Sequence, residues 1–312
     1  MIYGIIILVI LMLVVVLNIC YIRTNHYYNS FLFERNFLEV KNQENFEYVV
    51  TGTSNALAAV CSFRKNNNIL IISGRYQSLR LDKFLLYNQM ESLKKGSKVF
   101  LFVSPCVLLY DKELRKDIFE HASSLPSHGC ELPFLAIIKR TFPIIFEPKR
   151  LKYIFIDVDR KSQFYPNNTT TTSIYEAEKR MSALVESWKK TFRLKEFTMH
   201  SLSKQNLDVI DVNKSIINTM LEACQINNLK VFIVTTPMSS CLLKYYGEDF
   251  LDYFRKSIHD IIEDKDIPFL DFMQDADFVN TVSLITDGGF ILNKSGSEIF
   301  MRKLIKKCRE FD

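Results

Sequence analysis

The 312-residue sequence is poor in histidine, glycine and proline, with 5, 9 and 8 of them. Few glycines and prolines leave few breaks in regular structure, and a hydrophobic share of 48% excludes a disordered or collagen-like chain. We therefore expect one large domain rich in helices and strands.

The sequence also lacks metal, nucleotide and nucleic-acid signatures. Its 7 cysteines include no C-x-x-C pair, so we expect neither a metal nor another cofactor. The net charge of +5 is spread along the chain without an RNP, zinc-finger or helix-turn-helix pattern, so no nucleic-acid partner is expected. The phosphate-binding patterns G-x-G-x-x-G and G-x-x-x-x-G-K-[ST] are missing too, which argues against a nucleotide-binding protein.

The first 22 residues carry no charged side chain, and residues 5–17 read IIILVILMLVVVL. A helix over residues 1–22 would be about 30 Å long, enough to cross a bilayer core. The segment lacks the basic start and the small-x-small cleavage site of a signal peptide, so we predict an uncleaved transmembrane anchor. Arg23, Arg35 and Lys41 follow it, which by the positive-inside rule favours a cytoplasmic position for that side. Residues 23–45 are predicted to be a stalk or linker.

Short apolar runs alternate with longer amphipathic stretches over residues 46–312. This alternation is typical of a three-layer α/β/α domain with a mostly parallel sheet. Strands are predicted at residues 46–50, 68–72, 98–103, 153–158, 230–235 and 268–272, and helices at 77–95, 174–192, 213–227, 239–264 and 295–309. Residues 106–198 exceed a simple crossover, so we expect an inserted cap there. Within it, NNTTTT at 167–172 matches two overlapping glycosylation sequons but equally fits a polar loop.

The turn after the first predicted strand reads Thr51-Gly52-Thr53-Ser54-Asn55. Ligands of an open parallel sheet collect where strands end and helices begin, which makes this turn a candidate site. Gly52 permits a tight turn, and Ser54 would stand at a helix N-terminus, where backbone N–H groups stabilise an oxyanion. Serine is also a common helix N-cap, so the turn alone is compatible with a purely structural serine.

Several stretches in the same order resemble the blocks of the SGNH, or GDSL-type, hydrolase family, as found in members from polysaccharide loci. VVTGTSNALAA (49–59) resembles the first block, IISGRYQSLRLD (71–82) the second and KKGSKVFLFVSP (94–105) the third strand. VFIVTTPMSS (231–240) resembles a later strand, and FLDFMQDADF (269–278) the lead-in to the last block. The resemblance covers most of residues 46–309. It implies a flavodoxin-like fold and an esterase or O-acyltransferase that acts on acyl esters of a cell-surface polysaccharide, outside the cytoplasm.

The resemblance also implies roles for individual residues. Ser54 would be the nucleophile and Asp287 the aspartate of the triad. Gly74, Ser54 and Asn55 would bind the oxyanion or the substrate.

The last block departs from the family, which carries Asp-x-x-His before a Leu-Asn pair. Here the sequence is TDGGFILNKSG (286–296), and either Phe290 or Ile291 stands at the histidine position. Neither side chain can accept a proton. The third-block asparagine is missing as well, because residues 104–106 read SPC.

Another histidine would have to replace the missing base. His121, His128 and His200 lie in or near the predicted cap, whereas His259 lies on an amphipathic helix and His26 beside the membrane segment. A lone histidine on a helix is more often structural than catalytic. Two functions therefore stay open: an acyl-ester enzyme that uses Ser54, or a catalytically inactive relative that serves as a glycan-binding or assembly module at the membrane.

Overall fold

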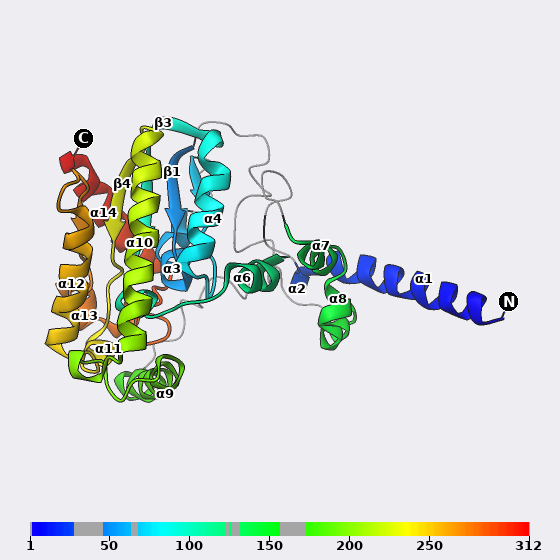
Figure 1. The fold of residues 1–312 in the computed structure, drawn as a ribbon. Helices are drawn as coiled ribbons and strands as arrows, with labels where there is room; N and C mark the ends of the chain where they lie inside the picture. The colour runs from blue at the N-terminus through cyan, green and yellow to red at the C-terminus, as the bar shows by residue number, and fades with distance from the viewer. Residues whose placement is uncertain are drawn as a thin grey trace.

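Five parallel strands form one sheet in the order β2-β1-β3-β4-β5 (Figure 1). In the computed structural model, which describes residues 2–27, 46–63, 68–122, 125, 132–156 and 173–311, Val49 of β1 lies opposite Leu70 of β2 and Val99 of β3. The strands are β1 (Phe46–Thr51), β2 (Ile69–Ile71), β3 (Leu93–Phe102), β4 (Lys230–Val234) and β5 (Phe269–Leu270). Because every pairing is parallel, the carboxyl ends of all five strands meet at one edge.

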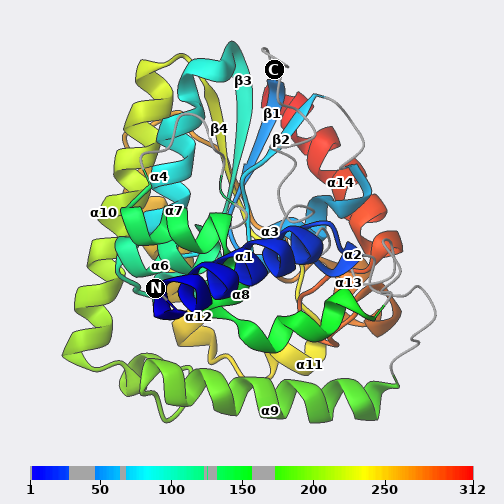
Figure 2. The same ribbon diagram turned by 90° about the vertical axis from the view of Figure 1, so that its right-hand side faces the viewer.

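Successive side chains of a strand point to opposite faces, and two apolar clusters result. Val49 and Leu101 belong to one cluster, with side chains of α4 (Leu79–Gln89), α10 (Lys204–Ile226) and α12 (Glu248–Ile262). Val50 and Phe102 belong to the other, with side chains of α3 (Ser54–Val60) and α14 (Lys294–Cys308). Figure 2 shows α4 and α10 on one side of the strands and α14 on the other.

An inserted region connects β3 to α10, and it divides into two parts. Helix α9 (Ile174–Phe192) crosses the lower end of the domain, whereas α7 (Phe134–Thr141) and α8 (Pro143–Phe146) lie beside α1 (Ile2–Ile22) (Figure 1). The shorter elements are α2 (Asn25–Tyr27), η3 (Cys61–Phe63), η4 (Met90–Ser92), α5 (Pro105–Leu108), α6 (Leu114–His121), η6 (Pro148–Ile154), η7 (Met199–Ser201), α11 (Ser240–Leu243), α13 (Ala276–Val279), η8 (Val282–Leu284) and η9 (Arg309–Phe311).

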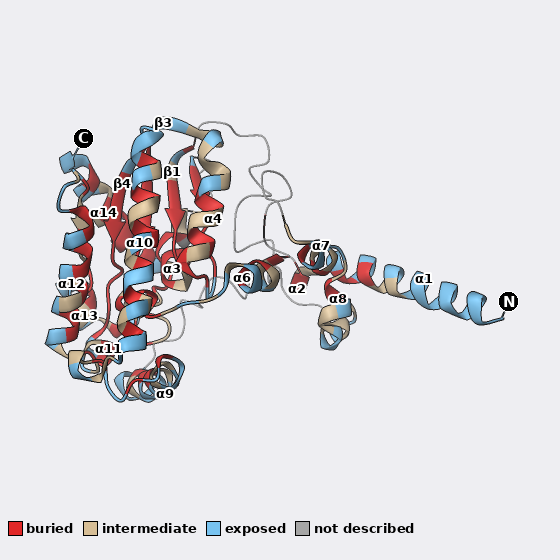
Figure 3. Ribbon diagram, in the orientation of Figure 1, coloured by how far each residue is buried: buried red, intermediate tan, exposed pale blue. Residues whose placement is uncertain are grey.

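Helix α1 is 21 residues long and projects away from the domain. Its side chains are exposed over most of its length and buried only near its C-terminal end (Figure 3). By length and composition it is able to cross a membrane, as expected for the N-terminal segment.

The α/β class and parallel sheet agree with the sequence prediction, and five of the six predicted strands coincide with β1 to β5. The strand predicted at residues 153–158 is wrong. Tyr153 and Ile154 end the 3₁₀ helix η6, where the ring of Tyr153 stacks on His26 at a centroid distance of 3.5 Å. The apolar character of Tyr153 and Ile154 therefore reflects packing near the end of α1. Residues 157–158, the sequons at 167–172 and residues 28–45 of the predicted stalk lie outside the described residues.

Two predicted helices are also shorter than expected. The one at 77–95 ends at Gln89, and β3 begins at Leu93, where it pairs with Phe46 of β1. The one at 239–264 consists of α11 and α12, separated around Gly247. A Cβ at Gly247 would lie 2.5 Å from a side-chain oxygen of Asp249 and 3.0 Å from Thr198 Cγ2, so a larger residue at this break would require these side chains to move.

Candidate functional site

The strand order reverses between β1 and β3, because β2 lies on one side of β1 and β3 on the other. Such a switch point is where open α/β sheets usually bind their ligands. A pocket of about 730 Å³ includes residues from the segments that follow both strands. Its walls come from the turn after β1 with the start of α3, the segment after β3, helix α9 and the loop before α14. The lining residues include Thr53, Ser54, Leu57, Ser104, Cys106, Leu184, Trp188, Phe192, Leu242, Asp287, Phe290 and Ile291.

Ser54 is the first residue of α3 and is half-buried in the wall of this pocket. The chain reaches it through Gly52, whose φ of +130° is a conformation that other residues rarely adopt. A Cβ at Gly52 would stand 2.9 Å from the Cβ of Phe102. Glycine therefore lets β1 turn into α3 directly beside β3, which places Ser54 at the switch point.

Asn55 is buried and does not line the pocket. Its Oδ1 accepts a hydrogen bond from the Thr53 hydroxyl at 2.6 Å, and its Nδ2 donates to Thr236 Oγ1 at 3.1 Å. The Asn55 side chain thus fastens the Ser54 turn to the segment after β4. Substrate binding by this side chain, which the resemblance implied, would require these bonds to break.

Gly74 lies after β2, and its N–H already donates to the Gly52 carbonyl at 3.2 Å. The next residues, Arg75, Tyr76 and Gln77, line the pocket, but Gly74 itself does not. An oxyanion at Ser54 would therefore compete with a bond that joins two turns of the sheet edge. The role of Gly74 in oxyanion binding stays a prediction from the resemblance.

Asp287 lines the same pocket as Ser54, although 232 residues separate them in the chain. Its Oδ1 accepts hydrogen bonds from the backbone N–H groups of Gly289, Phe290 and Ile291, at 2.9, 3.0 and 3.0 Å. Burial raises the pKa of the Asp287 carboxyl, and these three bonds oppose the rise. The carboxylate thus shapes the loop of residues 287–291, on which the resemblance would place a histidine.

Phe290 and Ile291 both line the pocket, and the ring centroid of Phe290 is 5.5 Å from that of Trp188. The two positions at which the resemblance places a histidine are therefore part of an apolar wall. No histidine of the described chain takes its place in the pocket lining.

The four described histidines have other neighbours. The Nε2 atom of His121 is 3.5 Å from Asp117, and the His259 ring packs edge-on against Phe269 with 5.6 Å between the ring centroids. His200 belongs to η7, and His26 stacks on Tyr153 near the end of α1. The fifth histidine of the sequence, His128, lies outside the described residues.

Cys106 is the other potential nucleophile in the pocket lining, near the place of the family's third-block asparagine. Its Sγ is 3.0 Å from the Tyr246 hydroxyl, and burial raises the pKa of the thiol to about 12. The thiolate is the nucleophilic form of cysteine, so this raised pKa disfavours Cys106 as a nucleophile at neutral pH.

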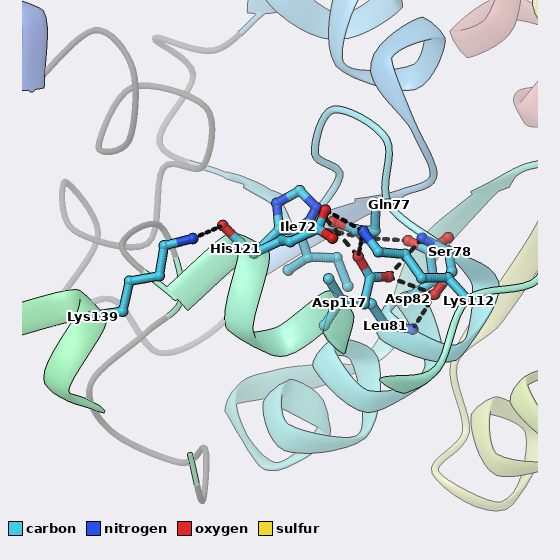
Figure 4. A network of polar contacts seen from close by, with 10 residues as sticks. Ile72, Gln77, Ser78, Leu81, Asp82, Lys112, Asp117, His121 and Lys139 are labelled. Carbon is cyan, nitrogen blue, oxygen red and sulfur yellow. Dashed lines mark hydrogen bonds and ion pairs between the residues drawn. The ribbon is translucent and has the colours of Figure 1, made fainter. Parts of the chain in front are cut away.

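A buried carboxylate behind the Ser54 turn was not singled out by the sequence reasoning (Figure 4). Asp82 Oδ1 accepts hydrogen bonds from Thr51 Oγ1 at 2.6 Å, from the Gly52 N–H at 2.9 Å and from Gln77 Nε2. Burial raises the pKa of Asp82 to about 6 against the effect of these bonds. The available signal was its spacing, because a carboxylate between Leu79 and Leu85 falls on the apolar face of the predicted helix.

A second carboxylate, Asp117 of α6, holds the start of α4. Its Oδ2 accepts bonds from the Ser78 N–H at 3.0 Å and the Ser78 hydroxyl at 2.5 Å, and its Oδ1 is 2.9 Å from Lys112 Nζ (Figure 4). His121 belongs to this structural network.

Trp188 and Phe192 of α9 complete the apolar wall, and the sequence signal for them was only the amphipathic pattern of residues 174–192. Across the ranges that the structure describes, no group of three or more His, Cys, Asp or Glu side chains is placed to hold a metal ion. Compared with protein-family models and with curated proteins, the chain matches none.

Proposed function

We propose that residues 46–311 form an SGNH-type domain of the flavodoxin-like class that binds an acyl ester of a cell-surface glycan beside Ser54 without hydrolysing it. The strand order β2-β1-β3-β4-β5 supports the fold part of this proposal, because flavodoxin-like sheets have the same order. The position of the pocket at the β1/β3 switch point supports it as well.

The observation that carries the proposal is the absence of an imidazole from the described lining of a pocket that holds both Ser54 and Asp287. A serine hydroxyl is a weak nucleophile at neutral pH unless a base removes its proton. Backbone N–H groups stabilise a developing oxyanion but cannot accept that proton. Such a site binds an ester and leaves it intact.

The residues that line the pocket favour binding of the acyl group of the ester over binding of its sugar. Its volume of about 730 Å³ is in the range of small-molecule sites, and Leu57, Leu184, Trp188 and Leu242 make much of the wall apolar. Burying apolar surface contributes about 25 cal/mol per Å², whereas a bare sugar would lose hydrogen bonds with water there. Ser54 lines the pocket, and its hydroxyl is the donor that an ester oxygen would meet, because the Thr53 hydroxyl donates to Asn55 Oδ1.

Binding is measurable through Trp188, the single tryptophan of the chain, which lines the pocket. We expect 6-O-octanoylglucose to change its emission in the detergent-solubilised full chain, and glucose to leave it unchanged. Ser187→Phe should weaken the effect at least about tenfold, because Ser187 is an exposed pocket-lining residue of α9. Ser182→Phe is the matched control, since Ser182 is also exposed on α9 but does not line the pocket. Equal weakening by both variants, or no response to the ester, would contradict the proposal.

A second candidate is an active esterase or O-acyltransferase with Ser54 as nucleophile and Asp287 as orienting residue. The shared pocket of Ser54 and Asp287 favours it. Its base would come from outside the described residues, with His128 as the remaining histidine. This candidate predicts ester turnover that both Ser54→Ala and His128→Gln abolish.

We further propose that α1 is an uncleaved single-pass anchor and that the domain lies outside the cytoplasm, as in the polysaccharide-locus proteins that the sequence resembles. The length and apolar composition of α1 support the anchor, whereas Arg23 beyond its end opposes this orientation. Mass analysis of the mature chain tests the anchor, which a new N-terminus near residue 25 would exclude. Labelling of a Ser182→Cys variant by a membrane-impermeant maleimide in intact cells tests the orientation.

A further inference from the structure

Residues 132–156, here called the collar, expose large apolar side chains beside the end of α1. The collar consists of α7, α8 and η6 with their connections. Its exposed members, with the exposed fraction of each residue, are Phe134 (74%), Leu135 (60%), Ile137 (48%), Ile145 (52%), Phe155 (84%) and Ile156 (49%). Outside α1, no other stretch of this length in the described ranges exposes as many, and such a patch indicates a contact surface.

Three of the four exposed side chains of α7 lie on one face of that helix, and the fourth, Leu135, lies at the edge of that face. Phe134, Ile137 and Thr141 follow one another at helical spacing and are exposed. Ala136 and Lys139 lie on the opposite face and are buried, with Lys139 Nζ 4.6 Å from the centre of the Phe119 ring of α6. The face of α7 that carries Lys139 therefore packs against α6, and the face that carries Phe134 and Ile137 is exposed.

Contacts with the last turns of α1 fix the position of the collar along the axis of α1. Asn18 Nδ2 donates to the Thr141 carbonyl at 2.6 Å, and Tyr21 is fully buried in a cluster with Tyr27 and Ile144. Asn18 is four residues before Ile22, the end of α1, which corresponds to about 6 Å along the helix axis. A 21-residue helix spans about 31 Å, close to the thickness of a bilayer core, so this end lies at the boundary with the lipid headgroups.

The charge of the collar is strongly one-sided. It contains Lys139, Arg140, Lys149, Arg150 and Lys152 but only one acidic residue, Glu147. Lys149, Arg150 and Lys152 line a second pocket of about 400 Å³ together with His26, Tyr153 and Glu147, whose carboxylate is 2.5 Å from Arg150 Nε. Basic side chains beside a membrane surface attract anionic lipid headgroups.

We propose that the collar is a second membrane contact, in which the apolar face of α7 and the Phe155 region enter the interface of an anionic bilayer while Lys149 and Lys152 bind lipid phosphates. The proposal rests on α1 being a membrane anchor. Continuity with α1 and the excess positive charge select a lipid surface over a second copy of this net-positive chain, whose matching collar would be repelled.

This contact would orient the pocket relative to the membrane. Lys139 of α7 donates to the Glu120 carbonyl of α6 at 3.4 Å, and Asp117 of α6 holds Ser78 at the start of α4 (Figure 4). The collar is thereby connected through α6 to the helix that carries Asp82, behind the Ser54 turn.

Tryptophan scanning in lipid nanodiscs tests the proposal on the full chain. In a Trp188→Phe background, we would introduce one tryptophan at Phe134, Phe155, Leu11 or Phe311 and use phosphatidylglycerol-containing lipids brominated near the headgroup end of the acyl chain. Phe134 and Phe155 are exposed, so Phe134→Trp and Phe155→Trp should fold. We expect bromine to reduce the emission of both variants roughly twofold or more, relative to unbrominated lipid. Phe311→Trp, on an exposed residue at the far end of the domain, should be unaffected (Figure 1).

The Leu11→Trp variant separates failure of the collar from failure of the anchor. Leu11 lies in the middle of α1, so its emission should fall more with bromine placed deep in the acyl chain. Quenching at Leu11→Trp without quenching at Phe134→Trp and Phe155→Trp would overturn the collar proposal and leave the anchor in place. No quenching at Leu11→Trp would overturn both.

Charge is tested by the same readout. Replacing phosphatidylglycerol with phosphatidylcholine should weaken the quenching at Phe155→Trp, and adding Lys149→Gln and Lys152→Gln should remove this lipid dependence. Quenching that is identical in both lipids would overturn the anionic part of the proposal.

Discussion

The carboxylate of Asp82 accepts a hydrogen bond from the Gly52 N–H at 2.9 Å, and so holds the turn that presents Ser54 from behind. Asp82 is fully buried, and within the described structure its second oxygen, Oδ2, has no hydrogen-bond partner. An ionised carboxylate in this position lacks part of the solvation that water would give it. This explains why the pKa of Asp82 is raised to about 6.

The raised pKa makes stability depend on pH in a predictable direction. The folded chain holds the Asp82 proton more tightly than the unfolded chain, so the contribution of Asp82 to stability falls as pH rises from 3.8 through about 6. Over this window the fall is about 3 kcal/mol, and Asp82→Asn removes it because asparagine does not titrate. Denaturant unfolding of both proteins at pH 4.5 and pH 7.5 checks this: the variant should gain relative to the wild type at the higher pH. Parallel pH profiles would contradict the assignment.

Gly52 should be intolerant of substitution. Gly52→Ala adds a Cβ 2.9 Å from Phe102 Cβ and 3.0 Å from the Phe102 carbonyl oxygen, at a φ of +130°. We expect a loss of about 2 kcal/mol or more in the free energy of unfolding. Gly96→Ala is the control: Gly96 also has a positive φ, of +82°, but an added Cβ meets nothing within 4 Å, so the loss should be about 1 kcal/mol. Equal losses in thermal or denaturant unfolding would show that crowding against β3 is unimportant.

Asp287 should contribute more to the shape of its loop than to chemistry. Asp287→Ala leaves three N–H groups without their acceptor, and we expect it to destabilise the fold by about 2 kcal/mol. Asp287→Asn keeps an acceptor oxygen at the same place and should cost less than half as much. A measurement that finds the two variants equally stable would contradict this role.

A base placed on the same loop should create activity. Phe290→His puts an imidazole in the pocket lining, three residues after Asp287. A well-placed base contributes about 10² to 10⁴ in rate, so we expect at least about tenfold faster hydrolysis of p-nitrophenyl butyrate. Phe290→Leu controls for the loss of the aromatic ring, and adding Ser54→Ala should abolish the gain. Rates for Phe290→His that match those for Phe290→Leu would show that Ser54 cannot be activated from this position.

The elements that can be predicted from sequence are those in which the spacing of apolar residues reflects which side of the element is buried. The sequence predicts helix α9 at residues 174–192, as observed, because its apolar spacing is a local signal. A strand was wrongly predicted at residues 153–158 because Tyr153 and Ile154 are apolar for another reason: they pack near the end of α1, in a contact between segments distant in sequence. The helix at 204–226 begins nine residues before its prediction, because its capping box at Ser203 and Asn206 was not recognised.

The candidate site was predictable to a similar extent. The turn at Ser54 follows from a strand, a glycine and a helix in sequence order, and Asp287, which the resemblance singles out, lines the same pocket as Ser54. The N–H of Gly74 donates to the carbonyl of Gly52, which belongs to the turn after another strand. The side chain of Asn55 donates to Thr236, which is 181 residues away in the chain. Periodicity cannot reveal such bonds, since they depend on how the strands align. The position of Trp188 in the pocket wall could not be predicted either, because it depends on how α9 packs against the rest of the domain.

The central claim is that the Ser54 pocket holds an ester without turning it over, and steady-state hydrolysis tests it most directly. The solubilised full chain and its Ser54→Ala variant would be compared with p-nitrophenyl butyrate as substrate, at protein concentrations high enough to detect rates near the uncatalysed background. We predict equal rates for the two proteins, because no described imidazole can take the Ser54 proton. Turnover by the wild type that Ser54→Ala abolishes would show that another base has been recruited, and would contradict this account.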